Sequence, residues 1–212
     1  MGPDIRASAL VVVDMQNDFA HPDGAWGRQS RNPGARIDFE FLRSTIEPTG
    51  RLLRAFRAAG RPVVFLISPV KPDFADGAWP REAWSPGFLA EGTWGAQVLD
   101  ELAPESSDHV VIKKTFGGFT NTALDAILRN LGVTTCVFAG VTTNVCVAST
   151  VRGAIDHNYS CIVVTDAVAE TSRKAHEAEL ETGFLAWFGN CATSEDVVAM
   201  LAAGVSVGVA SA

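Results

Sequence analysis

Ala139-Gly140-Val141-Thr142-Thr143-Asn144-Val145-Cys146-Val147 joins the end of a strand to the start of a helix and decides the fold. The β-branched and apolar run 133–139 predicts a buried strand, which Gly140 interrupts. From Asn144 onward, apolar residues at helical spacing predict a helix: Val147, Val151, Ala154 and Ile155. Cys146 is therefore expected in the first helical turn, where free N–H groups and the helix dipole lower a thiol's pKa. Taken alone, this turn fits a buried structural cysteine better than a nucleophile.

Composition narrows the class of protein. The chain has 212 residues, of which 47% are hydrophobic and 19% are charged, which suits a single domain over residues 1–212 with a sizeable core. The net charge of −7 and the lack of a Lys/Arg cluster argue against nucleic acid as a partner. No apolar run is long enough to span a membrane, and the first strand begins too early to leave room for a signal peptide. A cytoplasmic enzyme is expected.

The cysteines show neither a C-x-x-C pair nor zinc-binding spacing. Cys136 and Cys161 lie in apolar runs, where a reduced cysteine behaves as a small hydrophobic residue. Cys191 belongs to a short candidate strand, so only Cys146 lies in a polar turn. We expect no disulfide framework.

Strand-like and helix-like segments alternate along the chain. Short apolar runs predict strands at Ala9–Val13, Pro62–Ile67, His109–Ile112, Thr135–Ala139, Cys161–Val164 and Cys191–Thr193. Helical spacing predicts helices at Ser44–Ala59, Thr122–Leu131, Thr171–Phe188 and Ser194–Leu201, with Ser194 as an N-cap. This alternation indicates an α/β fold with a parallel sheet, in which ligands bind beyond the carboxyl ends of the strands. The irregular segment 68–94 is expected to be a surface excursion, either a lid or a subunit contact.

Three predicted strands end in residues that can do chemistry. Asp14 follows the first strand, Lys113 and Lys114 follow the third, and Cys146 follows the fourth. Each has a plainer explanation: the aspartate as a loop cap, the lysines as solvated side chains, the cysteine as core. Together, an acid, a base and a thiol at one edge of the sheet predict nucleophilic catalysis.

The chain resembles the cysteine hydrolases of the isochorismatase-like superfamily from Ala9 to about Met200. The motifs that carry the resemblance are residues 12–19 (Val-Val-Asp-Met-Gln-Asn-Asp-Phe), 113–119 (Lys-Lys-Thr-Phe-Gly-Gly-Phe) and 140–147 (Gly-Val-Thr-Thr-Asn-Val-Cys-Val). The resemblance implies a three-layer α/β/α sandwich around a six-stranded parallel sheet.

The resemblance also implies a role for each motif. By position, Asp14 is the catalytic aspartate, Cys146 is the nucleophile, and Lys113 rather than Lys114 is the catalytic lysine. A cis peptide bond is implied between Val141 and Thr142, which turns the Thr142 N–H toward the Cys146 N–H to form an oxyanion hole. Asp14 would accept the thiol proton, Lys113 would stabilise the thiolate, and water would hydrolyse the resulting thioester.

Differences within the superfamily narrow the substrate. Isochorismatases lack the nucleophilic cysteine, and nicotinamidases carry metal-binding histidines that segment 66–74 lacks. We therefore expect no metal and no other cofactor. Residues 118–128 and 143–150 are most similar to ureidoacrylate amidohydrolases, with biuret hydrolases and N-carbamoylsarcosine amidases as near relatives, which implies a carbamoyl or ureido C–N bond in a small molecule. A larger amide or lactam substrate, or a non-catalytic, redox-sensing role, remains the alternative.

The residues that contact the substrate are harder to predict. Phe19, Trp94, Phe119 and Val141 are the predicted substrate-binding residues, although apolar packing also explains the aromatic ones. Phe116 is a further candidate for the pocket wall. The family is usually oligomeric, so a homo-oligomer (dimer or tetramer) is expected.

Arginines are candidates for holding a substrate carboxylate. They are Arg28, Arg31 and Arg81, although a solvated surface role is the favoured explanation for each. Arg152, in the helix after Cys146, is expected to form a structural ion pair.

Overall fold

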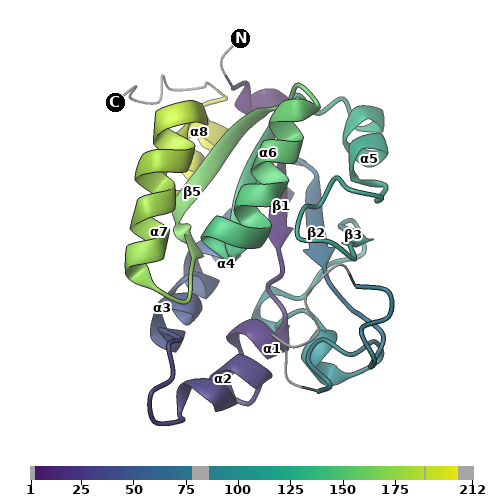
Figure 1. The fold of residues 1–212 in the computed structure, drawn as a ribbon. Coiled ribbons are helices and arrows are strands. Elements are labelled where there is room, and N and C mark those ends of the chain that lie inside the picture. The colour runs from purple at the N-terminus through teal and green to yellow at the C-terminus, as the bar shows by residue number, and fades with distance from the viewer. Residues whose placement is uncertain (1–2, 78–85, 189, 205–212) are drawn as a thin grey trace.

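A six-stranded, all-parallel sheet forms the centre of the protein (Figure 1). The computed structural model describes residues 3–77, 86–188 and 190–204. The strand order is β3-β2-β1-β4-β5-β6. The strands are β1 (Ser8–Val13), β2 (Val63–Ile67), β3 (His109–Ile112), β4 (Thr135–Val141), β5 (Ser160–Ala169) and β6 (Cys191–Ala192). The predicted sheet is confirmed.

Helices cover both faces of the sheet. The α-helices are α1 (Asn17–Ala20), α2 (Ala25–Ser30), α3 (Phe39–Ser44), α4 (Ile46–Ala58), α5 (Leu124–Asn130), α6 (Ala148–Asp156), α7 (Arg173–Glu179) and α8 (Ser194–Ala203). Short 3₁₀ turns lie at η1 (Ile5–Ala7), η3 (Trp94–Ala96) and η4 (Asp100–Leu102), and π-helical turns at η5 (Thr143–Val147) and η6 (Leu180–Phe188). In the described part of the chain, no helix combines the length and the apolar character that a membrane span requires.

Two apolar cores follow from the alternation of side chains along the strands. In β1, Leu10 and Val12 point to one face, and Ala9, Val11 and Val13 point to the other. The first face packs against α3, α4 and α8, and the second against α5 and α6. Because both faces are covered, the central strands are continuously apolar, and the result is the three-layer arrangement that the sequence predicts.

Some elements differ from the prediction. β5 continues five residues beyond Val164, through the polar pair Thr165-Asp166 and a register shift against β4, so its apolar run resumes at residues 167–169. The helix predicted over 171–188 is α7 followed by the wide turn η6. Thr193, not Ser194, is the N-cap of α8, because its hydroxyl accepts the N–H of Asp196 in a capping box.

The predicted excursion 68–94 is partly core. Residues 78–85 lie outside the described residues. On either side of them, Val70 pairs with Ala90, and Phe74, Phe88 and Leu89 are buried in the first core. Asp18 of α1 accepts the N–H of Leu89 at 2.7 Å, which ties the excursion to the carboxyl edge of the sheet.

Candidate active site

Asp14 lies directly after β1 and is completely buried. Its backbone has a φ of 51°, in the left-handed region that asparagine and aspartate tolerate best. Its N–H donates to the carbonyl of Leu66 in the neighbouring strand, at 3.0 Å. One carboxylate oxygen, Oδ1, accepts the hydroxyl of Ser68 at 2.8 Å, and the other, Oδ2, faces Lys113.

Lys113 reaches the same point from β3, across the end of β2. Its ammonium donates to Asp14 Oδ2 at 2.8 Å and to the carbonyl of Thr115 at 3.2 Å, and its side chain is fully buried. Burial has the largest single effect and would lower the pKa of Lys113, but Asp14 and Cys146 together outweigh it, so the net pKa is raised and the ammonium stays charged. Lys114 turns away to form an ion pair with Asp76 at 2.8 Å.

Cys146 lies in η5, a π-helical turn, rather than in the regular first turn that the sequence predicts. Its side chain is nearly buried, and burial raises the pKa of the thiol well above its ordinary value. The negative charge of Asp14 raises the pKa further, and the positive charge of Lys113 lowers it. The lowered pKa expected from the helix start is thus wrong, because desolvation dominates. Cys146 rests as a thiol and needs a base.

The turn that contains Cys146 has an unusual backbone and is anchored by two side-chain hydrogen bonds. The peptide bond between Val141 and Thr142 is cis. The hydroxyl of Thr143 and Nδ1 of His176 are hydrogen-bonded at 2.9 Å, which ties the turn to α7. The hydroxyl of Thr150 donates to the carbonyl of Cys146 at 2.6 Å and holds the turn against α6.

A cavity of about 270 Å³ opens onto the cysteine. Its walls come from three parts of the chain: aromatic rings, the turn around the cysteine, and the end of β5. The residues are Phe19, Trp26 and Phe116, then Thr142, Val145 and Cys146, then Glu170 and Thr171. The cavity is large enough for a small molecule, and both residues of the predicted oxyanion hole, Thr142 and Cys146, line it.

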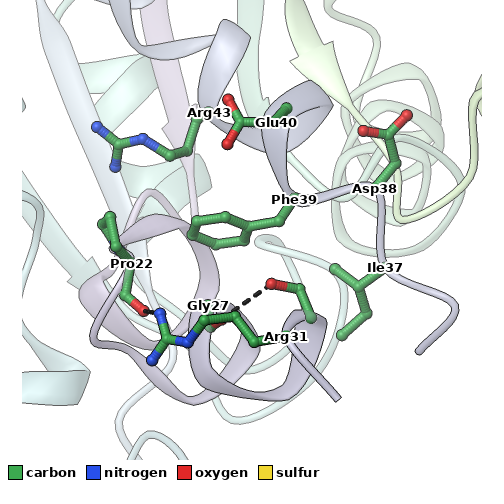
Figure 2. A pocket seen from close by; sticks show the side chains of 9 residues that line it. Pro22, Gly27, Arg31, Ile37, Asp38, Phe39, Glu40 and Arg43 are labelled. Carbon is green, nitrogen blue, oxygen red and sulfur yellow. Dashed lines mark hydrogen bonds between the residues drawn. The ribbon is translucent and has the colours of Figure 1, made fainter. Parts of the chain in front are cut away.

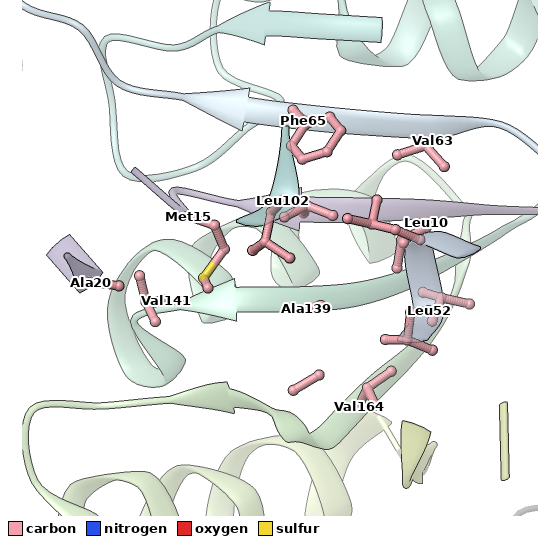
Figure 3. Close-up of a cluster of buried hydrophobic side chains, with 14 of the residues drawn as sticks. Leu10, Met15, Ala20, Leu52, Val63, Phe65, Leu102, Ala139, Val141 and Val164 are labelled. Carbon is pink, nitrogen blue, oxygen red and sulfur yellow. The ribbon is translucent and has the colours of Figure 1, made fainter. Parts of the chain in front are cut away.

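Two of the predicted substrate-binding residues have clear positions relative to this cavity. Phe19 lines it, with its ring edge-on to Trp26 at 4.8 Å. Val141 does not, because its side chain points into the first apolar core together with Met15 and Ala20 (Figure 3). The residue is the last of β4, and strand pleating turns it away from the cavity that the next residue, Thr142, lines.

The other two lie elsewhere. Phe119 stacks on His157 with ring centroids 5.1 Å apart and packs against Gly153 of α6, outside the cavity lining. Trp94 is 43% exposed and lies edge-on to His21 at 4.7 Å, also outside the lining. Phe116, the further candidate, does line the cavity.

The arginines proposed to hold a carboxylate do not line this cavity. Arg28 donates to the carbonyl of Asp23, and Arg31 donates to the carbonyl of Pro22 at 2.9 Å. Figure 2 shows Arg31 in a separate surface cavity, between Pro22 and Ile37. Arg81 lies outside the described residues. Arg152 forms an ion pair with Glu179 at 2.8 Å, as its expected structural role requires.

Sequence reasoning missed three residues of this region. Ser68 was part of an irregular segment, yet it holds Asp14. Trp26 was part of a loop without a recognisable pattern. Glu170 was missed because β5 seemed to end at Val164; the resumed apolar run at 167–169, aligned with β4, was the signal that could have found it.

Comparison with known proteins identifies the family of this chain. The chain matches the isochorismatase domain family over residues 8–196. It is 34% identical to the ureidoacrylate amidohydrolase RutB of Methylobacterium radiotolerans, over 92% of this chain and 81% of that protein.

Solved structures extend the likeness. A cysteine hydrolase from Pseudomonas syringae pv. phaseolicola superposes with a TM-score of 0.84 at 28% identity, covering 96% of each chain. The N-carbamoylsarcosine amidase of Thermoplasma acidophilum superposes with a TM-score of 0.72 at 32% identity, covering 89% of this chain and 96% of that one. The chain therefore belongs to the isochorismatase family of hydrolases.

Proposed function

We propose that this protein is a cysteine-dependent amidohydrolase that cleaves a carbamoyl, ureido or amide C–N bond of a small molecule. The observation that carries the proposal is the buried ion pair between Asp14 and Lys113, which acts on the thiol of Cys146 next to a cavity. The names of similar proteins, ureidoacrylate amidohydrolase and N-carbamoylsarcosine amidase, support the same bond type.

The geometry supports a two-step mechanism. Asp14 accepts the proton of the Cys146 thiol, and the ammonium of Lys113 offsets the charge on the sulfur. The sulfur attacks the carbonyl carbon, and the N–H groups of Thr142 and Cys146 bind the oxyanion. Asp14 then donates its proton to the leaving nitrogen, and the C–N bond breaks to leave a thioester.

The second step regenerates the thiol. Water attacks the thioester carbonyl while Asp14 takes one of its protons, and the same oxyanion site stabilises the intermediate. The C–S bond breaks, and the proton returns from Asp14 to Cys146. The raised pKa of Cys146 fits this sequence, because a neutral thiol is held ready beside its base.

The same raised pKa disfavours the redox-sensing alternative. Sensor cysteines react with peroxide as thiolates of lowered pKa, whereas burial raises the pKa of Cys146. A larger amide or lactam also fits poorly in a cavity of about 270 Å³. The small carbamoyl or ureido compound is thus the favoured substrate.

Ammonia release across a panel of small compounds tests the proposal. The panel contains ureidoacrylate, biuret, N-carbamoyl amino acids and nicotinamide, each assayed with and without a chelator because no metal is expected. Cys146→Ala should abolish release, while Cys191→Ala, at a half-buried cysteine of β6, should leave it unchanged. Turnover that persists in Cys146→Ala, or that the chelator removes, would refute the mechanism.

A further inference from the structure

Glu170 is a buried carboxylate in the wall of the cysteine cavity, and the mechanism above does not use it. It follows the last residue of β5, Ala169, which is paired with Val141 at the end of β4. Glu170 is therefore the neighbour of Thr142, the predicted oxyanion-hole residue, and both line the cavity. The side chain thus lies where the substrate's acyl group would be bound.

In the described residues, the carboxylate of Glu170 accepts hydrogen bonds from uncharged groups. Oε1 accepts the N–H of Thr171 at 2.8 Å and its hydroxyl at 3.1 Å, and Oε2 accepts the N–H of Asn144 at 3.4 Å. A carboxylate has about four acceptor positions, so Oε2 retains capacity for a further donor. These bonds hold the side chain in place, and among the described residues no ion pair balances its negative charge.

The net charge of the site, counted over the described residues, has the same sign as that of Glu170. The opposite charges of Asp14 and Lys113 cancel, and the raised pKa of Cys146 keeps its sulfur neutral. The net charge of the described groups around the sulfur is therefore the negative charge of Glu170. The other wall residues within the described ranges are apolar or uncharged. A substrate carboxylate placed here would be repelled, whereas an N–H or ammonium group would find an acceptor.

We propose that Glu170 is a specificity-determining residue that accepts a hydrogen bond from a substrate N–H or ammonium group and excludes carboxylate substrates. This inference rests on the proposed function and narrows its substrate class to uncharged or cationic ureido and amide compounds. It separates this protein from an enzyme that acts on ureidoacrylate, whose substrate carries a carboxylate.

Two alkylating agents of similar size test the charge selectivity without any substrate. Iodoacetamide is neutral and iodoacetate is anionic; in both, the sulfur of Cys146 forms a bond to the methylene carbon, iodide leaves, and the thiol proton is released. Peptide mass mapping measures the ratio of the iodoacetamide rate constant to the iodoacetate rate constant at Cys146, and N-acetylcysteinamide gives the same ratio for a free thiol. We expect the ratio at Cys146 of the wild-type protein to be about tenfold higher than that of the free thiol.

Variants test whether the preference for iodoacetamide comes from the carboxylate of Glu170. Glu170→Gln should lower the ratio about tenfold, whereas Glu170→Asp, which keeps the charge, should preserve it. Glu40→Gln removes an equal charge in the cavity of Figure 2 and serves as the control. A Glu170→Gln ratio equal to wild type would overturn the proposal; if that variant does not fold, a wild-type ratio at or below the reference would do the same.

A substrate series extends the test to turnover. Propylurea, N-(2-aminoethyl)urea and 3-ureidopropionate differ in charge at similar length. We expect kcat/KM for the first two to exceed that for the third at least about tenfold, and Glu170→Gln to reduce this margin. Equal or better use of 3-ureidopropionate would overturn the inference and leave the proposed function standing. Absence of Cys146-dependent turnover here and across the first panel would refute the proposed function, and the alkylation ratio would still decide the role of Glu170.

Discussion

Asp14 and Glu170 are both buried carboxylates at the carboxyl edge of the sheet, and they are compensated in different ways. Asp14 lies 2.8 Å from the ammonium of Lys113, so its charge is balanced inside the protein. Glu170 is held by N–H and hydroxyl donors, so its charge remains to act on whatever enters the cavity. The difference separates two tasks: the balanced pair handles protons at the sulfur, and the unbalanced carboxylate selects the ligand.

Breaking the balanced pair should have the largest effect. Lys113→Met leaves Asp14 buried without its cation, so we expect loss of activity and a fall of about 3–5 kcal/mol in the free energy of unfolding. Lys114→Met removes a partly exposed lysine and should cost no more than about 1 kcal/mol with activity retained. Urea denaturation and ammonia release measure both; equal behaviour of the two variants would contradict the assignment.

Asp14→Asn sharpens the comparison by removing the base at nearly constant shape. Asparagine also tolerates the positive φ at this position, but it leaves the Lys113 ammonium buried without its carboxylate, so we expect a loss of stability similar to that of Lys113→Met. We expect kcat/KM to fall by about a thousandfold, the scale of a lost general base. The variant protein should still bind substrate, which equilibrium dialysis can check. Activity within tenfold of wild type would argue that another group accepts the thiol proton.

The pH dependence of Cys146 alkylation tests whether the resting sulfur is a thiol. Since burial raises the Cys146 pKa, the thiolate fraction is small and grows with pH throughout the range below that pKa. The iodoacetamide rate at Cys146 should rise about tenfold per pH unit from about pH 6 to 9. A rate that levels off below about pH 8 would instead indicate a lowered pKa.

Ser68 provides the mildest change to the balanced pair. Its hydroxyl donates to Asp14 Oδ1 at 2.8 Å, so Ser68→Ala should misplace the base and lower kcat/KM by about tenfold, the value of one hydrogen bond to a charged group. Ser44→Ala removes a hydroxyl that donates to a carbonyl on exposed α3 and is the matched control. Equal activity of the two variants would remove Ser68 from the positioning of Asp14.

The sheet and the balanced pair could be predicted from the sequence for a physical reason. Asp14, Lys113 and Cys146 each follow an apolar strand closely, and parallel topology brings strand ends to one edge, whatever the loops do. The choice of Lys113 over Lys114 came from the family resemblance. In the structure, Lys113 turns inward to the buried Asp14, and Lys114 turns outward to Asp76.

The cavity wall could not be predicted in the same way. Trp26 reaches it through the packing of α2 against Phe19, a tertiary contact without sequence periodicity. Phe119 is the last residue of the lysine motif but packs against His157 and Gly153, so its place in that motif does not bring it to the cavity. Glu170 depends on β5 continuing through two polar residues, which an apolar-run criterion ends too early.

The most direct test of the account is mass spectrometry of the protein quenched during turnover of a panel compound. The account predicts an adduct on the peptide that contains Cys146, with the mass of the substrate minus its leaving amine or ammonia. Asp14→Asn should reduce its rate of formation, and Cys146→Ala should lack it. Full turnover by Cys146→Ala, or an adduct on a different residue, would contradict the central claim that Cys146 is the nucleophile.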